Sequence, residues 1–177
     1  MAGVKCIGYA DPPYPGQAKL YADDPNCCEV NHRVLIGWLD SHFDGWALST
    51  SSPALRDILP MCPEGVRVAA WVKPFASFKP GVNPAYCWEP VIWKPAVKSL
   101  GRDVPTVRDW VAESITLKKG LTGVKPVGFS LWLFDLLGLT VEDEFVDVFP
   151  GSGAVARAHR NWQAAARPFQ LELVEAV

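Results

Sequence analysis

Apolar positions along the chain follow two different spacings. Short apolar runs that end at proline, glycine or charged residues predict buried strands, whereas apolar residues three and four positions apart predict amphipathic helices. Six strands are predicted, at residues 5–10, 46–50, 66–72, 88–93, 143–148 and 169–174. Helices are predicted at residues 29–43, 53–61, 106–113, 129–137 and 154–166. Strands alternating with helices predict an α/β fold with a mostly parallel sheet and helices on both faces.

Local signals refine several of these boundaries. Ser51 and Ser52 before Pro53 predict an N-cap with proline in the first helical turn. The apolar helix at 129–137 is expected to stop at Gly138. Pro90 lacks an amide donor, so we expect 88–93 to be an edge strand. Residues 16–28 are polar without a clear period and are predicted to form a loop.

Size and composition indicate one globular domain. The chain has 177 residues, of which 49% are hydrophobic and 20% charged, as in ordinary globular proteins. Its apolar stretch at 127–139 is shorter and more polar than the roughly 20 residues that span a bilayer. The N-terminal residues do not resemble a signal peptide. We therefore expect a single cytoplasmic domain covering 1–177, with no membrane partner.

Cysteine and histidine patterns give no support for a metal centre. The five cysteines are an odd number without CxxC spacing, so neither a disulfide framework nor a four-ligand zinc site is expected. The three histidines lie far apart in sequence. We interpret them as packing or surface residues and predict no metal.

Basic residues are concentrated in the middle of the chain. Residues 66–125 contain ten Lys or Arg against four Asp or Glu, whereas 1–65 and 126–177 each have a net charge of −4. A basic middle between acidic flanks is typical of a protein with one phosphate-facing surface. A solvated charged face without a partner would explain the same pattern equally well. The loop-rich part of this segment, 74–125, is our candidate for the substrate-facing region.

Two loops that directly follow predicted strands have unusual compositions. The first is Asp11-Pro12-Pro13-Tyr14-Pro15-Gly16, and the second is Phe149-Pro150-Gly151-Ser152-Gly153. In the second, the glycines permit positive φ and a close backbone approach, and the helix that follows offers free N–H groups to an anion. A plain tight turn is the commoner explanation of two glycines. Ligands of such sheets bind beyond the carboxyl ends of the strands, where both loops lie.

The first loop suits a planar ring that carries an amino group. Its two prolines stiffen the backbone and remove donors, so that carbonyl groups are presented without competition. The Asp11 carboxylate and the Pro12 carbonyl can each accept one N–H, and Tyr14 can stack on the ring. Holding both hydrogens aims the nitrogen lone pair at an incoming methyl group, which is catalysis by orientation and charge stabilisation.

The two motifs together resemble the amino-methyltransferases of DNA, which modify adenine N6 or cytosine N4. DPPY at 11–14 matches their catalytic motif and FPGSG at 149–153 their cofactor motif, in the circularly permuted, β-like order. The segments 123–139 and 88–95 are similar to further parts of that family. The resemblance covers most of the chain. It implies a single Rossmann-like methyltransferase domain that uses S-adenosyl-L-methionine as cofactor.

The resemblance also implies roles for individual residues. Asp11 and Pro12 would hold the amine, Pro13 would stiffen the loop, and Tyr14 would stack on the base. The cofactor would be bound by residues in and beside the second loop and before the last apolar helix, namely Asp147, Phe149, Gly151, Ser152, Gly153, Lys125 and Pro126. The partner would be nucleic acid, most simply DNA with a flipped or single-stranded target base.

Several alternatives stay open at this point. DPPY favours adenine N6, but cytosine N4 or an RNA adenine would fit the same loops. A catalytically inactive nucleic-acid-binding subunit could keep the fold, and related folds methylate small molecules or proteins. No separate target-recognition domain is visible in the sequence, so contacts could also come from a second copy in a homodimer.

Overall fold

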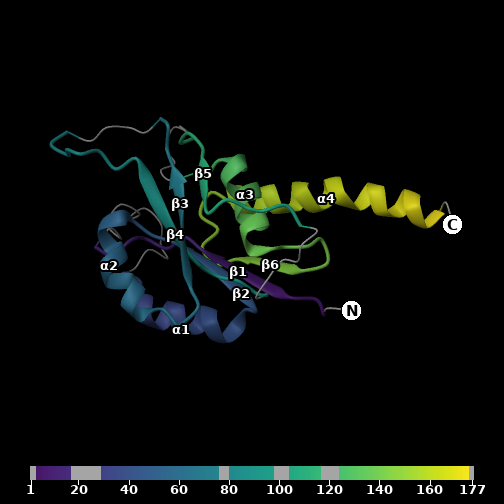
Figure 1. Ribbon diagram of the computed structural model, residues 1–177, viewed down its shortest axis with the longest axis horizontal. Helices are drawn as coiled ribbons and strands as arrows, with labels where there is room; N and C mark the ends of the chain where they lie inside the picture. Colours follow the sequence, from purple (N-terminus) through teal and green to yellow (C-terminus); the bar gives the residue numbers. More distant parts are fainter. Residues whose placement is uncertain (1–2, 17–28, 76–79, 98–103, 117–123, 176–177) are drawn as a thin grey trace.

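The computed structural model describes residues 3–16, 29–75, 80–97, 104–116 and 124–175, with side chains described up to residue 166. These residues form a six-stranded sheet in the order β5-β3-β4-β2-β1-β6, with helices on both faces (Figure 1). The strands are β1 (Cys6–Ala10), β2 (Gly45–Ser49), β3 (Arg67–Val72), β4 (Trp88–Lys94), β5 (Trp110–Ala112) and β6 (Glu144–Asp147). The helices are α1 (His32–His42), α2 (Leu55–Ile58), α3 (Val127–Leu137) and α4 (Ala154–Glu175).

The sheet is mixed and mostly parallel, as predicted. Strand β1 is parallel to both of its neighbours, β2 and β6, and β3 is parallel to β5. Strand β4 runs antiparallel between β2 and β3. The first residues of β4 therefore lie at the same edge of the sheet as the carboxyl ends of β1 and β6.

Alternating side chains of the strands build one apolar cluster on each face. Ile7 and Tyr9 of β1 pack with α3 and α4 in the first cluster, which also contains Trp71 and Phe129. Ala10, at the end of the same strand, packs with α1 and α2 in the second cluster. The period-2 alternation of β1 thus reaches both layers, and its end is buried on both sides. Figure 1 shows the α1–α2 layer and the α3–α4 layer on opposite sides of the sheet.

Most predicted boundaries agree with the structure to within a few residues. Asn31 caps α1 by accepting a hydrogen bond from the Val34 amide at 3.2 Å, which explains why this helix begins later than residue 29. Gly138 ends α3 in the left-handed conformation, with φ of 64°, as glycine at this position usually does. The predicted helix at 53–61 is α2 flanked by two short 3-10 turns, Ser52–Ala54 and Leu59–Met61.

The helix predicted at 106–113 is wrong. Residues Trp110–Ala112 form β5, which pairs with β3 in the register Ala70↔Trp110. The Ala70 amide also donates to the Asp109 carbonyl at 2.9 Å. Trp110 and Val111 favour strands. The local preferences for helix and for strand are both weak here, and pairing with the free edge of β3 makes the segment a strand.

The assignment of 88–93 to an edge strand is also wrong, because β4 is an interior strand. Pro90 lies opposite Ala70, and its carbonyl accepts a hydrogen bond from the Thr50 amide at 3.1 Å. Thr50 is one residue beyond the end of β2. Pro90 has no amide hydrogen to donate. Because it lies where the β2–β4 pairing ends, the rest of that pairing is unaffected.

The sixth strand predicted at 169–174 is wrong as well, since α4 continues to Glu175. The apolar residues of this segment are two apart, but Phe169 and Leu173 also continue a helical spacing from Trp162. A period of two over six residues does not separate the two structures. Most of the loop predicted at 16–28 lies outside the described residues.

Three observations concern membrane-spanning helices, cysteines and metal sites within the described residues. No described helix is long and apolar enough to cross a membrane. The described cysteines, Cys6, Cys62 and Cys87, are free. Within the same part of the chain, no group of three or more His, Cys, Asp or Glu is placed to hold a metal ion.

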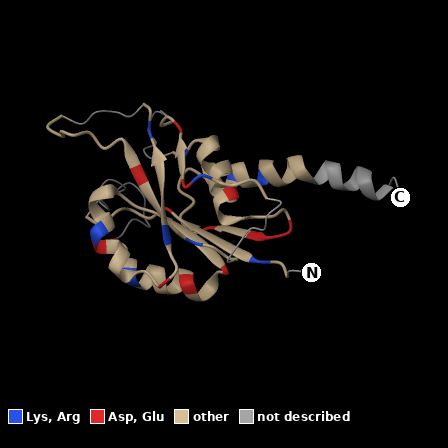
Figure 2. Ribbon diagram, in the orientation of Figure 1, with Lys and Arg blue, Asp and Glu red and all other residues tan. Residues whose placement is uncertain are grey.

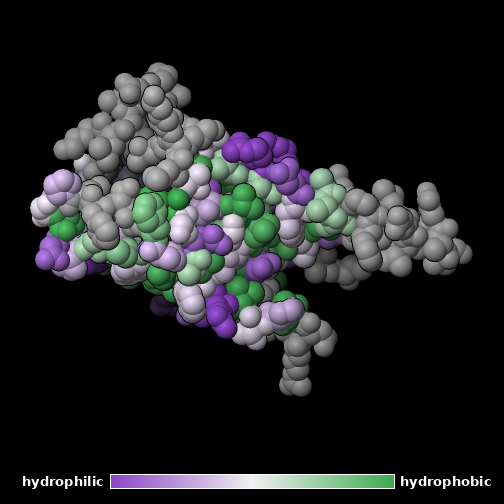
Figure 3. Space-filling model, turned by 90° about the horizontal axis from the view of Figure 1, so that it is seen from above, coloured by the Kyte–Doolittle hydropathy of each residue, from purple (hydrophilic) through white to green (hydrophobic). Residues whose placement is uncertain are grey.

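Seen from above, apolar and polar side chains are interspersed over the described surface (Figure 3).

Candidate active site at the carboxyl ends of β1 and β6

The two candidate loops leave the sheet side by side. Tyr9 of β1 lies opposite Asp147 of β6, and the Val148 amide donates to the Tyr9 carbonyl at 2.8 Å. Asp11 directly follows β1, and the loop at 149–153 follows β6 after one residue, Val148. Because the two strands are parallel neighbours, segments 138 residues apart in sequence meet at one edge of the sheet. Both loops follow strands, as predicted.

The catalytic loop predicted from the sequence is tied to the segment before α3. The Asp11 Oδ2 atom lies 3.2 Å from the Lys125 Nζ atom. The Lys125 side chain is only 4% exposed, and its ammonium group lies over the rings of Trp71 and Phe129. Burial raises the pKa of Asp11, and the nearby Lys125 charge opposes that rise. Pro12 is buried and Pro13 partly buried beside this ion pair.

Glu89 is a member of this site to which the sequence assigned no role, although its segment, 88–95, was part of the family resemblance. Its Oε2 atom accepts hydrogen bonds from the Tyr14 hydroxyl at 2.9 Å and from Lys125 Nζ at 3.0 Å. Its Oε1 atom pairs with Lys73. Burial raises the pKa of Glu89, but Lys125 and Lys73 outweigh that effect and lower it to about 2. A lone carboxylate within the apolar run WEPVIW was the signal that could have identified it.

The glycine-rich loop has the backbone that its sequence predicted. Gly151 and Gly153 have φ of 45° and 67°, in the left-handed region that favours glycine. The Gly153 amide donates to the Pro150 carbonyl at 2.6 Å, and the Gly153 carbonyl accepts from the Arg157 amide at 3.0 Å. The turn therefore leads directly into α4. Ser152 is partly buried, whereas Phe149 packs against the apolar cluster on the α1 side of the sheet.

Asp147 supplies a second carboxylate next to Asp11. Burial and the charge of Asp11 raise its pKa to about 6, although backbone amides of Ala156 and Phe149 act in the opposite direction. Its Oδ1 atom is buried and has no hydrogen-bond partner among the described residues. A buried carboxylate oxygen without a partner is unusual and costly in a folded protein. It marks a position where a donor from outside the chain would be stabilised.

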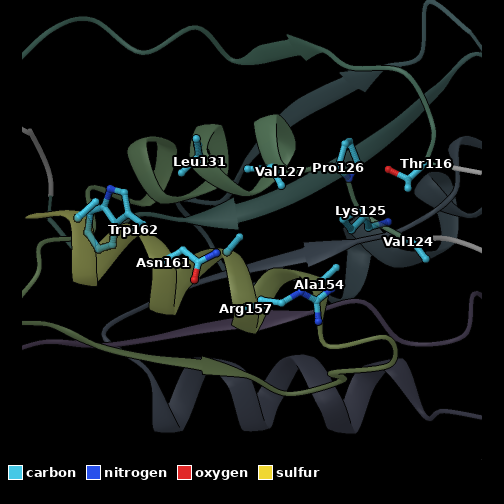
Figure 4. A pocket seen from close by; sticks show the side chains of 12 residues that line it. Thr116, Val124, Lys125, Pro126, Val127, Leu131, Ala154, Arg157, Asn161 and Trp162 are labelled. Atoms are coloured by element: carbon cyan, nitrogen blue, oxygen red, sulfur yellow. The ribbon is translucent and has the colours of Figure 1, made fainter. Parts of the chain in front are cut away.

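A cavity of about 500 Å³ lies between the amino-terminal halves of α3 and α4. Figure 4 shows Val127 and Leu131 of α3 facing Arg157, Asn161 and Trp162 of α4. Of the predicted cofactor-binding residues, Lys125 and Pro126 line this cavity. The others predicted for that role, Asp147, Phe149, Gly151, Ser152 and Gly153, do not line it, although Ala154, which directly follows the loop, does.

The described cations of the basic middle segment are already engaged within the protein, and Figure 2 shows basic and acidic residues interspersed over the fold. Lys94 pairs with Asp40, and Lys73 and Lys125 with Glu89. The two remaining cations stack on tryptophans, in the pairs Arg67–Trp93 and Arg108–Trp110. The other basic residues of this segment, Lys79, Lys98, Arg102, Lys118 and Lys119, lie outside the described residues.

Comparisons with known proteins give likeness in fold but not in sequence. No protein-family model matches the chain, and no curated protein matches it in sequence. The crystal structure of the M1.HpyAVI–SAM complex superposes with a TM-score of 0.58 at 19% identity, covering 89% of this chain and 78% of that one. The M1.HpyAVI structure gives a TM-score of 0.57 at 17% identity, covering 90% and 77%. The α/β chain described above therefore has the fold of M1.HpyAVI.

Proposed function

We propose that this protein is an S-adenosylmethionine-dependent methyltransferase acting on the exocyclic amine of a nucleobase, with adenine N6 of DNA as the first candidate. The observation that carries the proposal is the meeting of the Asp11 loop with the glycine-rich loop at adjacent parallel strand ends. The first loop offers acceptors for an amine, and the second offers a turn that a cofactor can approach closely. A protein of the same fold was crystallised as a complex with SAM, which supports this choice of cofactor.

The residues at the strand ends fit that cofactor. Its amino-acid part carries an ammonium group, which matches the unpartnered Oδ1 atom of Asp147. Gly151 and Gly153 would let the backbone approach closely, with Ser152 between them. Lys125 and Pro126 border a cavity of about 500 Å³, within the range typical of small-molecule sites. When bound, the cofactor supplies an electrophilic methyl group attached to a positively charged sulfur.

The chain's own contribution is to hold the amine in place and to stabilise charge. Asp11 and the Pro12 carbonyl would each accept one N–H of the target amine, so that the nitrogen lone pair faces the methyl donor. Tyr14 would lie on the base, with its hydroxyl already fixed by Glu89. The ionised Asp11 would also stabilise the positive charge that develops on the nitrogen as it is methylated.

Nucleic acid is the proposed partner because of the charge of the 74–125 segment. Its described cations are engaged internally, so phosphate contacts would fall to Lys79, Lys98, Arg102, Lys118 and Lys119. Binding by such residues releases counterions and weakens steeply with added salt. A target base in a duplex would have to be flipped out to reach Asp11.

The decisive experiment incubates the protein with methyl-labelled S-adenosylmethionine and unmodified DNA, followed by nucleoside analysis. We expect labelled N6-methyladenine. Label in N4-methylcytosine, or transfer only to RNA, would keep the chemistry and change the substrate. Binding of the cofactor and DNA without any transfer would overturn the proposal and leave a nucleic-acid-binding protein with the methyltransferase fold. Affinity for DNA that does not change with salt would count against a phosphate-facing surface.

A further inference from the structure

Four charged side chains and one hydroxyl form a connected network behind the candidate catalytic loop. Asp11 pairs with Lys125 at 3.2 Å, and Lys125 pairs with Glu89 at 3.0 Å. Glu89 also pairs with Lys73 and accepts a hydrogen bond from the Tyr14 hydroxyl at 2.9 Å. Two negative and two positive charges balance, so the network is neutral as a whole.

Burial raises the free-energy cost of holding charged groups in this network. A nearly buried ammonium group is stable only when opposite charges and hydrogen bonds replace its lost hydration. For Lys125 these are the carboxylates of Asp11 and Glu89, together with the ring faces of Trp71 and Phe129 at 5.0 and 5.6 Å. The position of the ammonium group is therefore fixed between the two carboxylates, and it fixes the Asp11 carboxylate in return.

The network connects residues outside the regular elements to a residue of an interior strand. Glu89 is the second residue of the interior strand β4 and pairs with Trp71 of β3, two residues before the first β2–β4 pair, Ser49↔Val91. Asp11 and Tyr14 belong to a loop, and Lys125 stands just before α3. Side chains anchored on an interior strand hold a site more accurately than side chains on loops. Glu89 contacts both Tyr14 and Lys125 through a single oxygen atom, Oε2.

We propose that Glu89 and Lys125 are positioning residues, which hold Asp11 and Tyr14 in the geometry that methyl transfer to an amine requires. This inference rests on the proposed function for its consequence in catalysis. Lys125 thereby has a role beyond bordering the cofactor cavity. Glu89 is placed in the catalytic arrangement without itself touching the substrate.

The network also makes a prediction about the protonation of Asp11. The groups that act on its pKa come from several elements: Lys125 and Lys73 lower it, and Glu89 raises it, in addition to burial. Tyr9 and Asp147 interact with the same carboxylate. Removing the charge of Glu89 should therefore lower the pKa of Asp11, and removing the charge of Lys125 should raise it. Loss of packing alone would not produce two shifts of opposite sign.

The test compares Glu89→Gln and Lys125→Met with the wild-type protein. The pKa of Asp11 is measured by NMR titration of carboxyl-labelled aspartate in the free protein, which needs no activity. We expect a lower pKa in Glu89→Gln and a higher one in Lys125→Met, with Lys125→Arg close to wild type. In the methylation assay Glu89→Gln should lower kcat roughly 10–100-fold, with cofactor Kd changed by no more than about threefold.

The matched control is Asp40→Asn. Asp40 pairs with Lys94 at the opposite end of β4, so this change also replaces a paired acid by its amide but lies away from the loop. It should leave the Asp11 pKa and kcat unchanged. If Glu89→Gln does not fold, Lys73→Met removes the second cation of the network and should give a small rise in the Asp11 pKa.

Unchanged Asp11 pKa values in folded variants, or equal shifts of one sign, would overturn the proposed network. Normal kcat in Glu89→Gln would overturn the positioning role. If the wild-type protein transfers no methyl group while the two opposite pKa shifts are observed, the proposed function fails and the network stands.

Discussion

The carboxylates at the two ends of the β1–β6 strand pair differ in their hydrogen bonding and in the direction of their pKa shifts. At the amino end, Asp143 accepts hydrogen bonds from the amides of Lys5 and Thr140 and from the Thr140 hydroxyl, each at 2.9 Å. Its side chain is 3% exposed and pairs with the Lys5 ammonium group at 3.0 Å. Burial raises the pKa of Asp143, but these hydrogen bonds prevail and lower it.

At the carboxyl end, burial raises the pKa of both Asp11 and Asp147, and the charge of Asp11 raises the pKa of Asp147 further. Asp147 leaves one oxygen without a partner among the described residues. One end is thus arranged for the stability of the folded chain, and the other holds carboxylates at a cost to it. Buried carboxylates with shifted pKa values and unsatisfied oxygens are typical of functional sites.

The largest expected effect is on catalysis at the carboxyl end. Asp11→Ala should lower the methyl-transfer rate roughly 10²–10³-fold, because it removes an acceptor and the charge that stabilises the transition state. The same change leaves Lys125 with Glu89 as its remaining carboxylate partner, so the midpoint of thermal unfolding should fall as well. Single-turnover kinetics and thermal melts of the same sample test both statements. A rate that stays within a few fold of wild type would show that Asp11 does not hold the amine.

At the amino end the expected effect is on stability instead. Asp143→Asn should lower the free energy of unfolding by about 1–3 kcal/mol, since it leaves buried donors poorly satisfied, with no change in the transfer rate. Because its pKa is lowered on folding, the contribution of Asp143 is fully present above the ordinary value of 3.8 and is lost as the pH falls through the folded value. Urea unfolding of wild type and variant should therefore converge at acidic pH. A difference that does not diminish as the pH falls below 3.8 would assign the effect to shape and not to charge.

Features marked by local sequence signals were predicted well, whereas features that depend on contacts between distant segments were not. The strand before Asp11 and the helix before Gly138 were predicted to within a residue or two, because a strong apolar run or period and a breaking residue mark them. Strand β5 was missed, since the pairing of Trp110 with Ala70 is a tertiary contact that no local pattern records. The Asp11 and 149–153 loops are each contiguous in sequence, so motif and resemblance could predict them as candidates, and both do follow strands.

Glu89 shows the limit of that approach for the site. It lies 75 residues from Tyr14 and 36 from Lys125, and only the antiparallel placement of β4 brings the three together. An acid inside an apolar strand indicates that some partner is needed, but it does not say which one. The network could therefore be suspected from sequence and assigned only from the fold.

The smallest predicted effect is on cofactor binding through Asp147, and it sharpens the contrast between the two ends. With a pKa of about 6 in the free protein, Asp147 is protonated at pH 5 and ionised at pH 7, so affinity for S-adenosylmethionine should rise over this range and then level off. Asp147→Asn should abolish the rise and weaken binding at pH 7 roughly tenfold, the loss of one hydrogen bond to a charged group.

The same variant also has an expected effect on stability. A raised pKa means that the ionised form of Asp147 disfavours folding above the ordinary value of 3.8, so the cofactor-free variant should be no less stable than wild type at pH 7. Isothermal titration between pH 5 and 7 measures the first effect and thermal melts the second, with Asp57→Asn, on the exposed surface of α2, as the control. Tight binding by Asp147→Asn with the wild-type pH dependence would mean that the unpartnered oxygen serves some other donor.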